Sequence, residues 1–177
     1  MGAGIAQVVA EAGCNVLLRD IDLGFVERGL TVIAHNLEKA VKKGKLEQEK
    51  KEEIIKRIIG IVDLRDAADV DLVIEAIVEN LEIKKEVYQE LDKICKPETI
   101  FASNTSSLSI TAMAAVTNRP QQVIGMHFFN PVQVMELVEI IKGSDTSEET
   151  FQKVYDFTKM IGKTPVVVNE APGFVVN

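Results

Sequence analysis

The sequence predicts an α/β fold with a doubly wound, mostly parallel sheet. Short apolar runs alternate with amphipathic segments along the 177 residues. Several of these runs are continuous and rich in β-branched residues, which is typical of buried parallel strands. Glycines, prolines and short polar stretches separate the segments, as expected where helices and strands end. The length suits one domain with its own core.

The first elements indicate a nucleotide-binding unit. Residues 1–10 predict a glycine-rich helix that Gly13 ends, and residues 15–20 predict a buried strand with Asp20 at its carboxyl end. This order is the second half of a Rossmann-like dinucleotide-binding unit, in which a strand and two further glycines come first. We therefore expect a chain truncated at its start, with a sheet that lacks its first strand.

The remaining elements follow in alternation. Residues 21–59 are helical and highly charged, and Gly44 divides them into two helices. Ser147 is the expected N-cap of a later helix, which Gly162 closes. The other predicted helices cover residues 80–95, 109–116 and 147–161. The other predicted strands cover residues 58–62, 70–77, 99–103, 123–128, 134–141 and 165–168.

Composition excludes several classes of protein. The formal net charge of −7 argues against nucleic acid as a partner. Hydrophobic residues make up 46% and charged residues 27%, which is a globular composition. Cys14 and Cys95 have neither metal-ligand nor disulfide spacing, so we expect no bound metal. Two isolated cysteines also indicate a reducing, cytoplasmic setting. No apolar run is long enough to span a bilayer, so no membrane association is expected.

Asp20 is the first candidate for a binding role. An acid at the end of this strand can accept both hydroxyls of an adenosine ribose, which selects NAD over its 2′-phosphorylated form. Arg19 beside it could instead meet a 2′-phosphate, and a surface acid or helix N-cap is the alternative interpretation. The glycines of the preceding helix favour the cofactor role.

Two further clusters follow buried strands. Glu79 and Lys84 come after residues 70–77, but their spacing alone is better explained by a helix-capping turn. Residues 103–107 are five consecutive small polar residues. One interpretation is a loop that cradles a ligand, and the other is a loop that caps a helix; the sequence favours neither. A group of lysines could hold a phosphate, although a solvated helix face explains it better. The group is Lys39, Lys42, Lys43 and Lys45.

The most informative pattern surrounds His127. It ends the apolar run 123–128, and Glu139 follows twelve residues later. A histidine can exchange a proton near neutral pH, and a carboxylate that folds back on it would fix its tautomer. Taken alone, a histidine in an apolar segment is more often a hydrogen-bonded core residue than a catalyst.

Four motifs together resemble the 3-hydroxyacyl-CoA dehydrogenases, and among them the bacterial 3-hydroxybutyryl-CoA dehydrogenases. The motifs cover residues 1–7, 103–108, 127–131 and 172–177. The resemblance implies NAD as the cofactor, a short-chain 3-hydroxyacyl-CoA as the substrate, and hydride transfer at C3. It also implies an NAD-binding domain over residues 1–171. Residues 172–177 would then begin a linker to a helical C-terminal domain that is absent here, and that domain would form the homodimer.

The resemblance also assigns roles to residues. His127 matches the catalytic base, Glu139 its acidic partner, Ser106 a serine near the substrate oxygen and the nicotinamide, and Asn177 an asparagine that holds the substrate. Cofactor contacts are implied for Gly2, Asp20, Glu79, Lys84, Ser106 and Asn130. Contacts to CoA are implied for Asn36, Lys43 and Ser106.

Two alternatives stay open from the sequence. One is a dehydrogenase of another 3-hydroxy acid, which would not depend on Lys43. The other is a non-catalytic fragment that only binds nucleotide. We expect this chain to lack parts of the family pattern at both ends. For that reason we expect weak NAD affinity and little turnover from these 177 residues alone.

Overall fold

The computed structural model describes residues 1–170, which fall into two compact units. Unit 1 comprises residues 1–63 together with the short segment 130–134. Unit 2 comprises residues 64–129 and the chain from Met135 onward. Each unit contains a sheet of its own and is described separately below.

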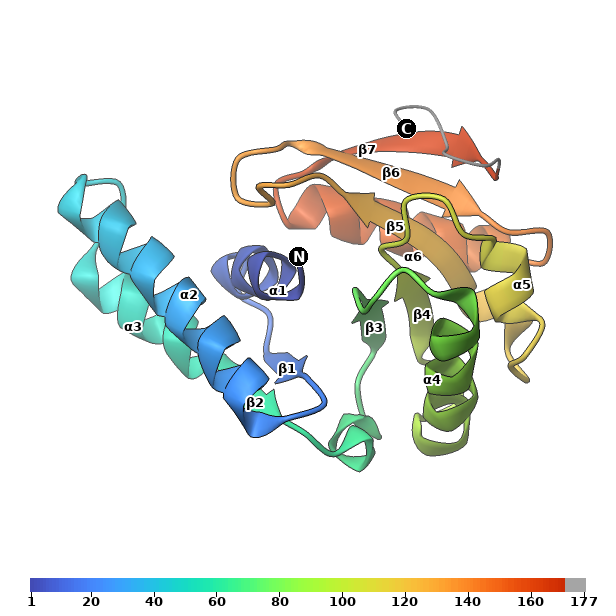
Figure 1. The fold of residues 1–177 in the computed structure, drawn as a ribbon. Coiled ribbons are helices and arrows are strands. Elements are labelled where there is room, and N and C mark those ends of the chain that lie inside the picture. Colours follow the sequence, from blue (N-terminus) through green and yellow to red (C-terminus); the bar gives the residue numbers. More distant parts are fainter. Residues whose placement is uncertain (171–177) are drawn as a thin grey trace. The chain divides into compact units, whose positions relative to one another are not determined.

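Unit 1 consists of three helices and a two-stranded parallel sheet (Figure 1, blue to cyan). The elements are α1 (Gly2–Glu11), β1 (Val16–Arg19), α2 (Leu23–Lys42), α3 (Gln48–Lys56) and β2 (Ile58–Ile61). Strand β1 pairs with β2 from Val16 opposite Ile58 to Arg19 opposite Ile61. The break predicted at Gly44 is confirmed, since this residue has a φ of 66° between α2 and α3.

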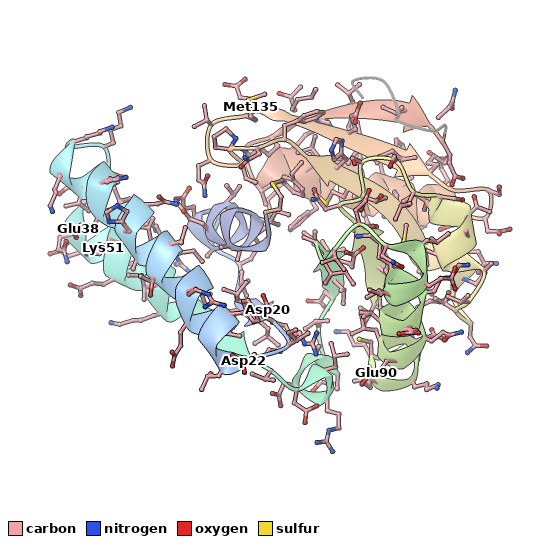
Figure 2. The ribbon with its side chains drawn as sticks, in the orientation of Figure 1. Asp20, Asp22, Glu38, Lys51, Glu90 and Met135 are labelled. Carbon is pink, nitrogen blue, oxygen red and sulfur yellow. The ribbon has the colours of Figure 1, made fainter. Side chains whose placement is uncertain are left out.

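The core of unit 1 forms where the apolar faces of its helices meet the small sheet. Buried residues from α1, α2, α3 and β2 make one cluster: Ala6, Ala10, Ile33, Leu37, Ile54 and Ile58. An ion pair between Glu38 of α2 and Lys51 of α3 links the two helices at their surface (Figure 2). Helix α1 and strand β1 are thereby held on a packed support.

Up to residue 170, unit 2 contains the larger sheet, three α-helices and two short 3₁₀ turns. The turns are η1 (Leu64–Ala67) and η2 (Pro120–Gln122). The helices are α4 (Leu81–Ile94), α5 (Ile110–Ala114) and α6 (Glu148–Met160). The strands are β3 (Leu72–Glu75), β4 (Ile100–Ser103), β5 (Val123–Phe128), β6 (Leu137–Lys142) and β7 (Thr164–Asn169).

The five strands of unit 2 lie in the order β3-β4-β5-β6-β7. Strands β3, β4 and β5 run parallel, β6 is antiparallel to β5, and β7 is parallel to β6. Helix α6 packs against β5, β6 and β7 (Figure 1). The predicted α/β architecture with a mostly parallel sheet is confirmed. The parallel strands also bring the carboxyl ends of β3, β4 and β5 to one edge of the sheet.

Predicted element ends differ from those in the structure by about three residues at most. Ser147 accepts a hydrogen bond from the amide of Thr150 at 3.1 Å and caps α6 as predicted. The strand predicted over 134–141 begins instead at Leu137, and the segment 130–134 before it belongs to unit 1. There the buried side chain of Val132 lies close to Gly4 of α1.

Within residues 1–170, none of the helices combines the length and the apolar character that crossing a bilayer requires.

We predict that Gly125→Ala destabilises the protein by about 1–3 kcal/mol, the usual effect of overpacking. Gly125 lies directly opposite Ile141 in the sheet. A Cβ on Gly125 would come within 2.8 Å of the Ile141 Cβ. Urea unfolding followed by circular dichroism measures the change. Asn169→Ala, at an exposed position of the same sheet, is the control and should stay within about 0.5 kcal/mol of the wild type. Equal stability of the two variants would contradict the prediction.

Candidate active site

The sheet register places His127 and Glu139 directly opposite each other. His127 lies near the end of β5 and Glu139 in β6, and the two are partners in the antiparallel ladder. Their side chains meet, with 2.7 Å between the His127 Nδ1 and the Glu139 Oε2. The predicted pairing of these residues therefore follows from a hairpin in which each residue of one strand faces one of the other.

The contact between His127 and Glu139 is buried in the protein. The side chains of His127 and Glu139 are 9% and 1% exposed. An ionised carboxylate only accepts hydrogen bonds, so a neutral imidazole beside it carries its hydrogen on Nδ1, toward Glu139. The ring of Phe129 lies against the imidazole, with 4.6 Å between the ring centroids. The arrangement fixes the orientation of a group that can take up a proton.

A second cluster lies at the carboxyl ends of β3 and β4. Glu75 and Ser103 are opposite each other in the parallel ladder. The buried Glu75 carboxylate accepts hydrogen bonds from the Ser103 hydroxyl at 2.7 Å, the Ile77 amide at 2.7 Å and the Lys84 ammonium at 2.6 Å. An isolated buried charge would be costly, and these donors compensate it.

Glu79 joins the turn after β3 to the polar loop after β4. Its Oε1 accepts hydrogen bonds from the Thr105 hydroxyl at 2.5 Å and from the Ser106 amide at 2.9 Å. Partial burial works to raise the pKa of Glu79. The hydrogen bonds from Thr105 and Ser106 and the charge of Lys84 outweigh it and lower that pKa below its ordinary value. Glu79 therefore stays ionised and fixes the loop.

Asn104 ties the same loop to the histidine strand. Its backbone amide donates to the Glu75 carbonyl oxygen at 2.8 Å, and its side-chain oxygen accepts from the Phe128 amide at 2.8 Å. Phe128 is the residue after His127. The polar segment 103–107 is therefore an ordered loop beside the histidine, with Thr105 buried and Ser106 half-buried.

The candidate cofactor residues of unit 1 lie on α1 and after β1. No side chain of the described residues caps α1, and no acidic residue occupies its first turn, so its amides remain available to an anion. A Cβ at Gly2 would meet no other atom within 4 Å, which leaves open space there. Asp20 is exposed after β1, and Figure 2 labels it near Asp22, which begins α2. These groups fit a phosphate and a ribose.

The remaining predicted residues are less well defined. The Asn36 amide donates to the Gln7 side chain at 3.1 Å, within unit 1. Lys43 is exposed at the end of α2, and Asn130 is exposed in the segment 130–134. Asn177 lies outside the described residues. No cluster of three or more histidine, cysteine or acidic side chains able to hold a metal ion occurs between residues 1 and 170.

Two residues in unit 2 were not recognised from the sequence. Glu75 interrupts an otherwise apolar strand, and this interruption was the available signal, since a charge in a buried strand requires a partner. In the sequence Asn104 is only one member of the polar run 103–107. Its two opposite connections, to β3 and to β5, depend on a strand order that the sequence does not reveal.

The fold and these sites define the NAD-binding α/β part of a dehydrogenase, and comparison with known proteins identifies the family. Residues 1–171 match the family described as "3-hydroxyacyl-CoA dehydrogenase, NAD binding domain". The chain therefore belongs to the 3-hydroxyacyl-CoA dehydrogenase family.

Individual relatives agree with this assignment. The chain is 49% identical over 177 residues to a 3-hydroxybutyryl-CoA dehydrogenase of Clostridioides difficile, covering all of this chain and 63% of the relative. It is 45% identical to a 3-hydroxyadipyl-CoA dehydrogenase of Escherichia coli, covering all of this chain and 37% of that protein. The crystal structure of (S)-3-hydroxybutyryl-CoA dehydrogenase from Ralstonia eutropha superimposes with a TM-score of 0.98 at 46% identity, covering 100% of this chain and 62% of the other. The chain thus spans less than two thirds of these relatives.

Proposed function

We propose that this protein catalyses NAD-dependent interconversion of a short-chain 3-hydroxyacyl-CoA and its 3-keto form, with His127 as the general base. The observation that carries the proposal is the buried His127–Glu139 pair, 2.7 Å apart beside an ordered polar loop. The names of the relatives support the substrate class, and 3-hydroxybutyryl-CoA with acetoacetyl-CoA is the pair we propose.

The chemistry requires two separate acceptors. Oxidation of the hydroxyl removes a proton from oxygen and a hydride from carbon, and bound NAD⁺ supplies the acceptor for the hydride. The proton goes to the Nε2 of His127, the ring nitrogen on the side away from Glu139. Glu139 then stabilises the imidazolium that forms. Ser106 and Asn177 are proposed to contact the substrate.

The same proposal divides the remaining residues between cofactor and CoA. The amides of α1 near Gly2 are suited to the pyrophosphate and Asp20 to the adenosine ribose. Glu79, Lys84, Ser106 and Asn130 complete the proposed cofactor contacts. The exposed Lys43 is suited to a phosphate of CoA, with Asn36 nearby on the same helix.

The direct test is acetoacetyl-CoA-dependent oxidation of NADH by the full-length protein, followed by absorbance at 340 nm. We expect turnover with acetoacetyl-CoA, and comparison with 3-ketoadipyl-CoA sets the preferred chain length. Turnover with free 3-hydroxy acids and none with CoA esters would reject the substrate class. NADH binding without any turnover would favour a role limited to nucleotide binding.

We predict that Lys43→Ala raises the KM for acetoacetyl-CoA by about tenfold with little change in kcat. The contact between the Lys43 ammonium and a CoA phosphate would be the same in the ground state and the transition state. Its loss therefore weakens substrate binding without slowing the chemical step. The KM for acetoacetyl-N-acetylcysteamine, which lacks the phosphates, should not change. Lys45→Ala removes a similar exposed charge and is the matched control. An equal effect of Lys43→Ala on both substrates would contradict the CoA role.

A further inference from the structure

We propose that Gln7 of α1 is a positioning residue that holds Asn36 of α2 and the segment 130–134 in place for their ligands. The inference rests on the proposed function, in which Asn36 contacts CoA and Asn130, the first residue of that segment, contacts NAD. Gln7 itself touches neither ligand in this proposal. The three parts of the chain that it joins all belong to unit 1.

Gln7 is a buried polar residue in an apolar stretch of helix. It is the only polar residue between Gly2 and Ala10 of α1, and it is 4% exposed. Ala6 and Ala10 of the same helix belong to the apolar core of unit 1. A buried amide without hydrogen bonds is costly, so a glutamine at this position requires polar partners from elsewhere in the fold.

Those partners come from two other parts of unit 1. The Oε1 of Gln7 accepts one hydrogen bond from the Asn36 Nδ2 at 3.1 Å and one from the Gln133 Nε2 at 3.1 Å. Its Nε2 donates to the Glu11 Oε1 at 2.8 Å, within α1. A carbonyl oxygen has two lone pairs, so both acceptor positions are used. One oxygen atom therefore fixes both α2 and the segment 130–134 to α1.

The segment 130–134 also packs closely on the same face of α1. Val132 is 2% exposed, and a Cβ on Gly4 would come within 3.1 Å of the Val132 Cβ. The absence of a side chain at Gly4 permits this close approach. Gly4 lies one helical turn before Gln7, so the apolar contact and the hydrogen bond act side by side. The exposed Asn130 is thus presented from an anchored backbone.

The hydrogen bond at Asn36 leaves groups for a ligand. A side-chain amide has two N–H donors and a carbonyl oxygen, and Gln7 takes one donor. Asn36 is half-buried, so the second donor and the oxygen can serve CoA while the first fixes the orientation of the amide. Gln7 therefore acts on the CoA side through Asn36 and on the NAD side through the segment 130–134.

Nuclear magnetic resonance of the full-length protein tests this role without any ligand. The readouts are the side-chain ¹⁵N–¹H amide signals of Asn36 and Asn130. Gln7→Met removes both acceptor positions and keeps an unbranched side chain of similar length. Gln133→Met, at an exposed position, removes only the bond to the segment. Gln48→Met is the matched control, because this exposed glutamine of α3 bonds within its own helix.

We expect Gln7→Met to shift the signals of both asparagines. Gln133→Met should shift that of Asn130, and Gln48→Met should shift neither. Should Gln7→Met fail to fold, Gln133→Met still supplies the Asn130 readout. An Asn130 signal that stays unchanged in Gln133→Met would overturn the proposal, since the hydrogen bond to Gln7 would then not position the segment.

Ligand affinities separate positioning from a purely structural role. We expect Gln7→Met to raise both the Kd for NADH and the KM for acetoacetyl-CoA about fivefold, the effect of losing one neutral hydrogen bond. Gln133→Met should raise only the Kd for NADH. NADH fluorescence measures this Kd cleanly, since the chain contains no tryptophan.

The turnover number supplies the contrast. At saturating substrates kcat should change less than about twofold in both variants, because His127 pairs with Glu139 within the sheet of unit 2. A lower melting temperature of Gln7→Met with unchanged affinities would mean that Gln7 only supports the fold, against the proposal. If the wild type binds no NADH, the proposed function fails, while the ligand-free signals still decide the positioning role.

Discussion

Replacement of His127 by asparagine is expected to lower kcat for 3-hydroxybutyryl-CoA oxidation by about 10²–10⁴-fold, the usual contribution of a general base. Asparagine keeps a polar side chain in the strand but has no nitrogen that accepts a proton at working pH. The affinity for NADH should change little, because His127 is proposed to act on the substrate hydroxyl. A steady-state assay at saturating substrate, with the NADH Kd measured beside it, checks both expectations.

Glu139→Gln tests the second half of the same pair. An amide can donate to the Nδ1 of His127, so it allows the ring hydrogen to move to Nε2, where the base is needed. We therefore expect kcat to fall at least about tenfold. Glu136→Gln, at an exposed position just before β6, removes the same charge and should have no such effect. Full activity of Glu139→Gln would show that the pair is a structural contact of the sheet.

The sequence was most informative where one local pattern determines the structure. Apolar runs predicted the strands, and Ser147 and Gly162 marked the ends of α6 as expected. The separation of His127 and Glu139 allowed a hairpin but did not require one. Their direct opposition depends on the register of β5 and β6, which the surrounding core sets.

Long-range polar contacts were the part that the sequence could not reveal. Lys84 and Glu79 are five residues apart and looked like an incidental surface pair, yet Lys84 is buried because Glu75, nine residues earlier, receives its ammonium. The cost of burying such groups is met only by partners from other elements. Their positions follow from the order of the strands and cannot be inferred from spacing along the chain.

Arg119 shows the same principle in a residue devoted to stability, and Arg119→Ala is expected to destabilise the protein by about 3–5 kcal/mol. Its side chain is 9% exposed and its Nε donates to the Asp92 Oδ1 at 2.6 Å. The guanidinium also donates to four backbone carbonyl oxygens at or after the end of α4. These belong to Asp92, Cys95, Lys96 and Thr99.

The physical reason for this large effect is the loss of several buried partners at once. The last carbonyls of a helix have no N–H partner within it. Here one planar cation donates to the carbonyl of Asp92 in the last turn of α4 and to three carbonyls that follow the helix. Burial works to raise the pKa of Asp92, but hydrogen bonds from Asn118 and Arg119 lower it below its ordinary value. Without Arg119, Asp92 would keep its charge but lose its buried cation, and the carbonyls of Asp92 and Cys95 would lose the donor that Arg119 supplies.

Urea unfolding measured by circular dichroism is the test. Lys93→Ala removes an exposed cation from the same last turn of α4 and should change the stability by less than about 0.5 kcal/mol. Arg119→Lys keeps the charge but cannot reach all the carbonyls, so its loss should be intermediate. If Arg119→Lys matched the wild type, charge alone would explain the stabilisation. If Arg119→Ala matched Lys93→Ala, the hydrogen bonds to the end of α4 would contribute nothing to the fold.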